Sequence, residues 1–238
     1  MTFVRIKAKV ILIGYILASK ILRRKTMNNI LVIGAHFDDA ELGAGGTMAK
    51  YIAMGHNVYK ITLTDTEVKS DLMNLDIKTE TGRENSANAC AAIGAKEIDF
   101  PAAKYGNLTY TQETMQALEK VISDYDIDTC IFHFKEDYNT DHLAANQICY
   151  TAARHCDNLL MFQSNPYIIG ESFYPNVFVD VTDYVDKKRA ALQCYEAAHN
   201  RQGNLFETNI ERNKIWGYGN HCGYAEGFVA VKLKLEEH

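Results

Sequence analysis

The chain has 238 residues, of which 47% are apolar and 23% charged, and its formal net charge is −5 at pH 7. A chain of this size and apolar content can bury a full hydrophobic core. This excludes a disordered protein and removes the need for a disulfide or a structural metal merely to fold. The mildly acidic total argues against nucleic acid as a partner, because proteins that bind nucleic acid carry a basic surface.

The first 26 residues differ from the rest of the chain in charge. They hold seven Lys and Arg and no acid, so the remainder carries a net charge of −12. Their longest uncharged run, VILIGYILAS, would span about 15 Å as a helix, half of the hydrocarbon core of a bilayer. It is followed by no cleavage site typical of a secretory leader. We interpret residues 1–26 as a basic, apolar N-terminal extension. It could be an added structural element, a peripheral membrane anchor or sequence upstream of a core that starts at Met27.

The rest of the chain alternates between strand-like and helix-like segments. Short β-branched runs predict strands, and helical spacing with glycine stops predicts helices. In chain order these are strand 29–34, helix 42–54, strand 56–64, helices 80–93 and 111–123, strand 129–134, helix 141–155, strand 175–181, helix 183–200 and strand 223–235. This alternation indicates an α/β fold with a Rossmann-like, largely parallel sheet and helices on both faces. Because no repeat or Pro-rich linker interrupts residues 27–238, we expect a single domain there.

The six cysteines are scattered along the chain and form neither a C-x-x-C pair nor a zinc cassette. Scattered cysteines in a chain of this size are typical of buried thiols in a reducing compartment. We therefore expect a cytoplasmic protein that does not use cysteine catalysis, and association with a membrane through residues 1–26 stays open.

Two strand ends are rich in polar residues, and in open α/β sheets ligands bind beyond the carboxyl ends of the strands. The first strand leads into AHFDDAELG at residues 35–43. His36 and Asp39 lie three residues apart, so one turn can direct both side chains to a single point, and their donor atoms suit zinc. Asp38 would then point elsewhere and could act as a base on metal-bound water. The alternative is an ordinary turn whose acids cap the following helix.

The strand that ends near Phe134 leads into KEDYNTDH at residues 135–142. His142 would add a second imidazole from another strand end, unless it caps a helix or lies in the core. Together, His36, Asp39 and His142 leave a coordination position open for water, as catalytic zinc sites require. The same ligand set also serves iron(II) oxygenases, so the ligand types alone do not choose the metal.

Several segments resemble one family. Residues 30–50, ILVIGAHFDDAELGAGGTMAK, resemble the opening motif of the PIG-L (LmbE-like) zinc N-deacetylases, A-H-P-D-D-x-E-L-G-x-G-G. Residues 139–142, NTDH, resemble the family's second motif, which ends in D-H. Weaker matches follow in the family's order: residues 62–65, Arg83 with Glu84, residues 178–181 with Lys187 or Lys188, and YAEGF at 224–228. The resemblance runs from residue 29 to about residue 232, so it makes residues 27–238 a single LmbE-like deacetylase domain.

The resemblance implies a zinc-dependent hydrolase that removes the N-acetyl group from an N-acetylglucosamine-type sugar conjugate. By the same resemblance, His36, Asp39 and His142 would bind Zn²⁺, and Asp38 would be the general base. Zinc would polarise the amide carbonyl, while Asp38 takes a proton from the attacking water and passes it to the leaving amine.

Two residues depart from the family pattern at this site. Asn139 stands where many members have His; its amide can donate a hydrogen bond to the oxyanion but cannot supply a proton. We therefore expect Asp38 to carry both proton transfers, with His133 as the alternative carrier. Phe37 replaces the usual proline of the first motif, which removes a fixed φ and could loosen the turn.

Polar side chains on the strand-end loops would recognise the sugar, and the candidates are Arg83, Asp65 and Asn107. Arg83 would otherwise be a surface charge on a helix. The expected partner is a small-molecule amino-sugar conjugate and not a nucleic acid, and assembly into a homo-oligomer stays open.

Other interpretations come from different classes. Asn139 and Phe37 would also suit a catalytically inactive, sugar-binding relative of the deacetylases. A receiver-like signalling domain would hold Mg²⁺ on Asp38 and Asp39, but the chain is long for that class and Mg²⁺ prefers oxygen ligands to an imidazole such as that of His36. Dinucleotide binding is disfavoured because the glycines read G-A-G-G and begin nine residues beyond the strand.

Overall fold

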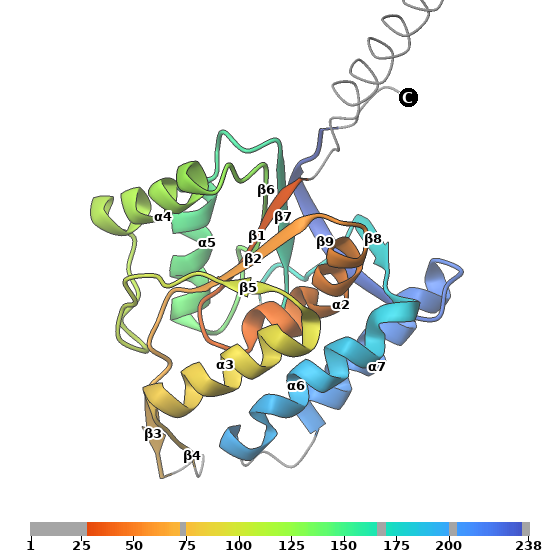
Figure 1. The fold of residues 1–238 in the computed structure, drawn as a ribbon, viewed down its shortest axis with the longest axis horizontal. Helices are drawn as coiled ribbons and strands as arrows, with labels where there is room; N and C mark the ends of the chain where they lie inside the picture. Colours follow the sequence, from red (N-terminus) through yellow and green to blue (C-terminus); the bar gives the residue numbers. More distant parts are fainter. Residues whose placement is uncertain (1–27, 72–74, 166–169, 200–203, 235–238) are drawn as a thin grey trace, which may run out of the picture.

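A seven-stranded sheet forms the centre of the computed structural model, which describes residues 28–71, 75–165, 170–199 and 204–234 (Figure 1). The strand order is β5-β2-β1-β6-β7-β9-β8. These strands are β1 (Asn29–Gly34), β2 (Asn57–Thr62), β5 (Lys96–Glu97), β6 (Thr129–His133), β7 (Asn158–Phe162), β8 (Val177–Asp180) and β9 (Ala225–Lys232). A separate antiparallel pair joins β3 (Val68–Ser70) and β4 (Leu75–Ile77).

The first five strands in this order are parallel, and only β9 runs against its neighbours β7 and β8. From β1 the chain first adds β2 and β5 on one side and then returns to add β6 and β7 on the other. The strand order therefore reverses between β1 and β6. A crevice opens beyond the carboxyl ends of the strands at such a reversal, and this is where open α/β sheets bind ligands.

Helices cover both faces of the sheet (Figure 1). The described helices are α2 (Asp39–Ala53), α3 (Thr79–Ile93), α4 (Gln112–Asp124), α5 (Thr140–Ala152), α6 (Val185–His199) and α7 (Asn204–Gly219), with a short 3-10 helix, η1 (Thr182–Tyr184). Alternate residues of β1 enter separate cores: Ile30 and Val32 pack on the α2 side, while Leu31 and Ile33 pack on the α5 side. This confirms the predicted Rossmann-like, largely parallel sheet with helices on both faces.

The sequence prediction missed the short strands β3, β4 and β5 as well as β7 and α7, although the segments that it did predict overlap the observed elements. The burial pattern of α7 explains one omission. Asn209 and Asn213 are 3% and 1% exposed, whereas Ile215 and Tyr218 are 71% and 88% exposed. Because buried asparagines accompany the buried Phe206 and Ile210 while other apolar residues are exposed, the usual amphipathic signal of a surface helix is weak in this segment.

Helix α2 is interrupted at Ala44, whose φ of −145° is not helical. The carboxylate of Glu226, on β9, accepts the N–H groups of Gly46 and the next residue, at 3.0 and 2.7 Å. Lys188 donates to the carbonyl of Leu42 at 2.8 Å and pairs with Glu226 at 2.7 Å. Side chains from two distant elements, α6 and β9, thus bond the backbone groups that the break in α2 leaves without helical hydrogen bonds.

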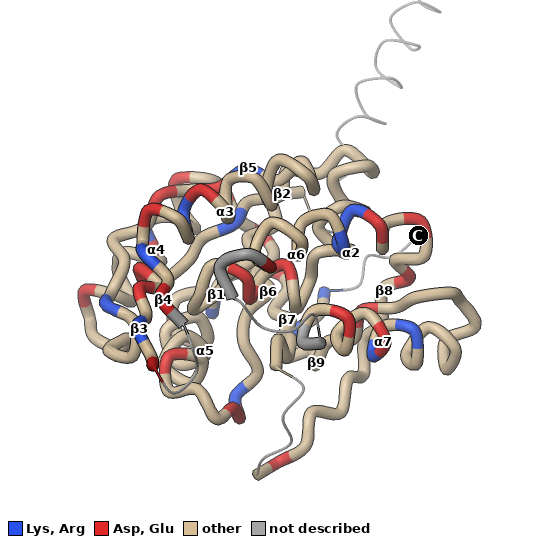
Figure 2. The backbone as a smooth tube through the Cα atoms, turned by 90° about the horizontal axis from the view of Figure 1, so that it is seen from below, with Lys and Arg blue, Asp and Glu red and all other residues tan. Residues whose placement is uncertain are grey.

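The described surface carries charges of both signs. Figure 2 shows Lys and Arg interspersed with Asp and Glu along the backbone. None of the helices in the described ranges combines the length and apolarity needed to cross a membrane. The extension predicted at residues 1–26 lies outside the described residues, so its role stays a prediction.

Candidate metal centre and active site

Three side chains meet where β1 and β6 end. His36 lies in the turn after β1, Asp39 begins α2, and His142 lies in the first turn of α5. His36 Nδ1 is 3.1 Å from His142 Nε2 and 3.3 Å from Asp39 Oδ2, and the latter two atoms are 3.3 Å apart. All three residues are buried. The structure therefore brings together the three residues that the sequence singled out as ligands.

This triangle of donor atoms fits a small divalent cation. A tetrahedral zinc ion with bonds of about 2.0–2.1 Å separates its ligand atoms by roughly 3.3–3.4 Å. The observed separations of 3.1–3.3 Å are close to that spacing. Three protein donors leave a fourth vertex for water or substrate, as in catalytic zinc sites. Two imidazoles and one carboxylate also suit iron(II), so the donor set fits a transition metal without selecting one.

Two further carboxylates orient the imidazoles of this cluster. Asp141 Oδ2 lies 3.2 Å from His36 Nε2, and Asp137 Oδ2 lies 2.9 Å from His142 Nδ1. Each carboxylate binds the ring nitrogen that faces away from the cluster and favours the ring proton there. The lone pair of the other nitrogen then faces the centre, which is the arrangement found around metal-ligating histidines.

The charges of Asp39 and His142 depend strongly on each other and on their neighbours. Burial opposes ionisation of Asp39, but His142 and His133 hold the pKa of its carboxyl well below the usual value. Burial also opposes protonation of His142, yet Asp39 and Asp137 raise the pKa of its imidazole to about 10. The carboxylates around the cluster thus favour positive charge at its centre, whether the charge is a proton or a metal ion.

His133 ends β6 and stacks on the ring of His142, with the ring centroids 4.0 Å apart. Its Nε2 accepts the N–H of Ala35 at 3.0 Å, and its buried Nδ1 has no hydrogen-bond partner among the described residues. Burial and the charge of His142 lower the pKa of His133. This ring is therefore neutral more readily than that of His142.

The two residues predicted to be catalytic occupy helix N-caps. Asp38 precedes α2 and is 8% exposed, and its side chain makes no capping hydrogen bond. Asn139 precedes α5, and its Oδ1 accepts the N–H of Asp141 at 2.8 Å. Because its oxygen caps the helix, the amide nitrogen is the part of Asn139 that can act as a donor toward a substrate.

Two of the three predicted substrate-binding residues belong to the loop region beside the cluster. Asp65 Oδ1 accepts the N–H of Tyr105 at 3.0 Å, and its Oδ2 pairs with Lys104 at 2.8 Å. The ring of Tyr105 lies 5.0 Å from that of His36, so Asp65 holds a loop that reaches the cluster. Asn107 is exposed on the same loop.

Arg83, the third predicted substrate-binding residue, lies on α3 and lines a pocket separate from the cluster. Its Nη1 is 3.5 Å from Asp99 Oδ1. Together with Phe37 and Thr62 it lines a pocket of about 150 Å³, whose lining includes none of the three candidate metal ligands. Because Phe37 follows His36 directly in the chain, this pocket adjoins the turn that carries the cluster.

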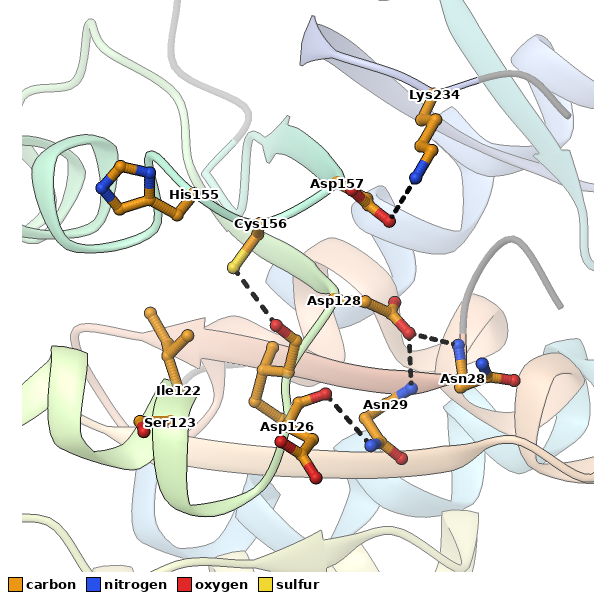
Figure 3. Close-up of a pocket in the computed structure, with 11 residues that line it drawn as sticks. Asn28, Asn29, Ile122, Ser123, Asp126, Asp128, His155, Cys156, Asp157 and Lys234 are labelled. Atoms are coloured by element: carbon orange, nitrogen blue, oxygen red, sulfur yellow. Dashed lines mark hydrogen bonds and ion pairs between the residues drawn. The ribbon is translucent and has the colours of Figure 1, made fainter. Parts of the chain in front are cut away.

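A larger pocket of about 490 Å³ opens at the other ends of β1 and β6 (Figure 3). Its polar groups bind one another: Asp128 accepts the N–H groups of Asn28 and Asn29, and Lys234 pairs with Asp157. The candidate ligands do not line it. We place the site at the cluster, because the convergent imidazoles and carboxylates and the strand reversal coincide there.

Sequence reasoning assigned no role to Asp137 or Asp141. The available signal was the density of acids in KEDYNTDH, just before and beside His142. That signal does not say which of those acids turns inward. The carboxylate of Asp141 accepts the N–H groups of Gly106 and Leu108, at 2.7 and 3.0 Å. That loop lies more than 30 residues before Asp141 in the chain, so a local sequence pattern cannot predict the contact.

Comparisons with known proteins bear on the same residues. A family model described as PIG-L, GlcNAc-PI de-N-acetylase, matches residues 31–153. The uncharacterized deacetylase YaiS of Escherichia coli (strain K12) is 29% identical over 175 residues, which cover 71% of this chain and 90% of that protein. The 4-oxalmesaconate hydratase of Pseudomonas putida is 24% identical over 246 residues, which cover 87% of this chain and 91% of that protein.

Solved structures share the fold. The conserved protein TT1542 from Thermus thermophilus has a TM-score of 0.71 at 21% identity and covers 89% of this chain and 97% of its own. GalB, a 4-carboxy-2-hydroxymuconate hydratase from Pseudomonas putida, has a TM-score of 0.72 at 22% identity, covering 89% of this chain and 99% of its own. The N,N'-diacetylchitobiose deacetylase of Pyrococcus horikoshii has a TM-score of 0.69 at 17% identity, covering 86% and 84%. Because the family model spans more than half of the sequence and includes both motifs, the chain belongs to the PIG-L family.

Proposed function

We propose that this chain is a zinc-dependent N-deacetylase that acts on an N-acetylglucosamine-type sugar conjugate. The observation that carries the proposal is the buried triangle of His36, Asp39 and His142, with Asp38 beside it in the same turn. Membership of the PIG-L family and the similarity to a deacetylase of Escherichia coli support the reaction type.

In this proposal His36, Asp39 and His142 hold the ion. When bound there, zinc supplies Lewis acidity, which polarises an amide carbonyl and lowers the pKa of water toward about 7. Asp137 and Asp141 keep the two imidazoles in the tautomer that can ligate, through their hydrogen bonds at 2.9 and 3.2 Å.

The chain's own residues carry the proton transfers. Asp38 takes a proton from water as its oxygen adds to the amide carbon, and then delivers that proton to the nitrogen of the leaving amine. The amide nitrogen of Asn139 donates a hydrogen bond to the oxyanion that develops on the carbonyl oxygen. Acetate and a free amino sugar are the products, so one water is consumed and no other reactant is needed.

The test uses the full chain, purified and loaded with zinc, and measures acetate release from N-acetylglucosamine conjugates together with bound metal. We expect about one zinc ion per chain in the wild type. Asp38→Asn should retain the metal and lose activity by roughly 10²- to 10⁴-fold. His142→Ala should lose both, whereas His155→Ala, an exposed histidine at the far pocket, should lose neither. A wild type that binds no zinc and stays inactive after zinc is added would refute the proposal.

A hydratase is the second candidate, and Asn139 is the observation that favours it. Addition of water to a carbon–carbon double bond needs a group that takes a proton from water and returns it to the second carbon, and no amine leaves. Asp38 can carry both transfers, so a site with an amide in place of the family's His suits such a reaction. The hydratase of Pseudomonas putida also aligns with 87% of the chain. Incubation of the same preparation with 4-oxalmesaconate separates the candidates: loss of its ultraviolet absorption without any acetate release would replace the deacetylase proposal.

A further inference from the structure

A lysine without solvent exposure lies beneath the turn that carries the cluster. Lys60, on β2, is fully buried, and the three N–H groups of its Nζ are shared among four acceptors within hydrogen-bond distance. They are the carbonyl of Phe37 at 2.6 Å, Glu41 Oε1 at 2.7 Å, Ser86 Oγ at 2.9 Å and Tyr195 Oη at 3.1 Å. Burial opposes the charge of Lys60, but Glu41 and its other neighbours raise its pKa well above the usual value, so the side chain is an ammonium ion.

The shortest of these bonds reaches the backbone between two functional residues. Phe37 lies between His36 and Asp38, and its carbonyl also accepts a hydrogen bond from Tyr195 Oη at 2.8 Å. Two buried donors, one of them charged, therefore hold a single carbonyl oxygen. A hydrogen bond from a charged donor is about twice as strong as a neutral one.

The Phe37 side chain is held as well. A Cβ built at Gly82, on α3, would lie 2.6 Å from the Phe37 ring, so the ring fits against that helix only because residue 82 is glycine. Phenylalanine does not restrict its own φ as the proline of the family motif would. Contacts to the ring and to the carbonyl replace that covalent constraint.

We propose that Lys60, with Tyr195, is a positioning residue that holds the 36–39 turn in the shape that lets His36 and Asp39 share one ion. The inference rests on the metal site of the proposed function. The four acceptors around Lys60 Nζ include neither His36 nor Asp39, so Lys60 acts on the turn through the Phe37 carbonyl. Glu41, the counterion, is the third residue of α2, and the pair therefore also fixes where that helix begins relative to β2.

The chain contains a closely matched control. Lys188 is also fully buried, pairs with Glu226 at 2.7 Å and donates to a backbone carbonyl, that of Leu42, at 2.8 Å. The carbonyl of Leu42 lies beyond the 36–39 turn, near the break in α2. Replacing either lysine by methionine leaves a buried glutamate without its counterion, so both changes should destabilise the fold through the same physical cause.

The experiment compares Lys60→Met, Lys188→Met and Tyr195→Phe in the full chain. Denaturant unfolding measures stability. Zinc affinity is measured by competition with a chromogenic chelator, and the visible spectrum of the Co²⁺ form reports the coordination geometry. We expect both methionine variants to lose stability, but only Lys60→Met to lose zinc affinity, on the order of tenfold, and to change the cobalt spectrum. Tyr195→Phe should lower zinc affinity several-fold.

Equal loss of zinc affinity in Lys60→Met and Lys188→Met, or no loss in either, would overturn the inference. If Lys60→Met does not fold, Tyr195→Phe decides alone, because it removes one hydroxyl and leaves the ion pair in place. Unchanged zinc affinity in that variant would then overturn the inference. A wild type without affinity for zinc or cobalt has a different meaning, because it refutes the metal site itself.

Discussion

Asp137→Asn tests how far an outer carboxylate controls the cluster. Asp137 Oδ2 lies 2.9 Å from His142 Nδ1, while its Oδ1 accepts the N–H of Asn139 at 2.9 Å. Asparagine has the same shape but a single amide oxygen, so it can satisfy only one of these donors. If the oxygen stays on Asn139, the NH₂ group faces His142 Nδ1. That nitrogen must then accept, and the ring proton moves to Nε2, the atom that faces His36 and Asp39.

The expected magnitude follows from this change of tautomer. Loss of an outer partner of a metal-binding histidine lowers metal affinity by about 10- to 100-fold, which corresponds to roughly 1.4–2.8 kcal/mol. Asp137→Asn both removes a hydrogen bond and places a proton on the ligating nitrogen. We therefore expect a loss at the upper end of that range.

The assay is zinc competition with a chromogenic chelator at neutral pH, on protein stripped of metal beforehand. Asp124→Asn is the control, because Asp124 is an exposed acid at the end of α4 that pairs only with Lys120 among the described residues. A thermal melt of both variants without metal checks that the fold is retained. A folded Asp137→Asn protein with the zinc affinity of the wild type would show that the outer carboxylate does not set the tautomer.

Three other changes test the fold around the site. Gly43→Ala would place a Cβ 2.2 Å from the ring of Phe162, and should lower the free energy of unfolding by about 1–3 kcal/mol in denaturant; wild-type stability would contradict that packing. Thr111→Ala removes the capping box of α4 and should cost about 1 kcal/mol in the same assay, whereas no change would mean that the cap is not needed. Burial opposes ionisation of Asp65, but Lys104 and two backbone N–H groups hold its pKa below the ordinary 3.8. Its stabilising effect is therefore present above about pH 4 and lost as the pH falls through the lower folded value. The stabilities of wild type and Asp65→Asn should differ at neutral pH and converge in acid, and a constant difference would exclude this linkage.

The parts of the fold that could be predicted are those with a local cause. The run NILVIG has only buried, non-polar residues after Asn29, because β1 is buried on both faces, and its predicted bounds match the observed strand. Helix α3 ends where Gly94 adopts a φ of +92°, a conformation that glycine takes without a steric cost. His36, Asp39 and His142 could be identified because they follow the ends of two predicted strands.

What could not be predicted depends on contacts between distant segments. In the sequence, Lys60 is a charged residue within a largely apolar strand. Only the folded chain shows that Glu41 and Tyr195 accept hydrogen bonds from its ammonium group. The pocket that Arg83 lines also could not be predicted, because the direction of a side chain on α3 depends on how that helix packs, and the contact of Arg83 with the sugar stays a prediction. Tertiary contacts of this kind leave no periodic signal in the sequence.

The break in α2 has a consequence for the order in which the protein matures. Every candidate metal ligand lies within residues 36–142, which leave the ribosome early. The N–H of Gly46, however, has its hydrogen-bond acceptor only after Glu226, 180 residues further along the chain, has been synthesised. A nascent chain can thus display both motifs while the helix that begins with Asp39 still lacks its partner. Completion of the backbone hydrogen bonds of α2 therefore belongs to a late step of folding, after β9 has been synthesised, although all three candidate metal ligands are present much earlier.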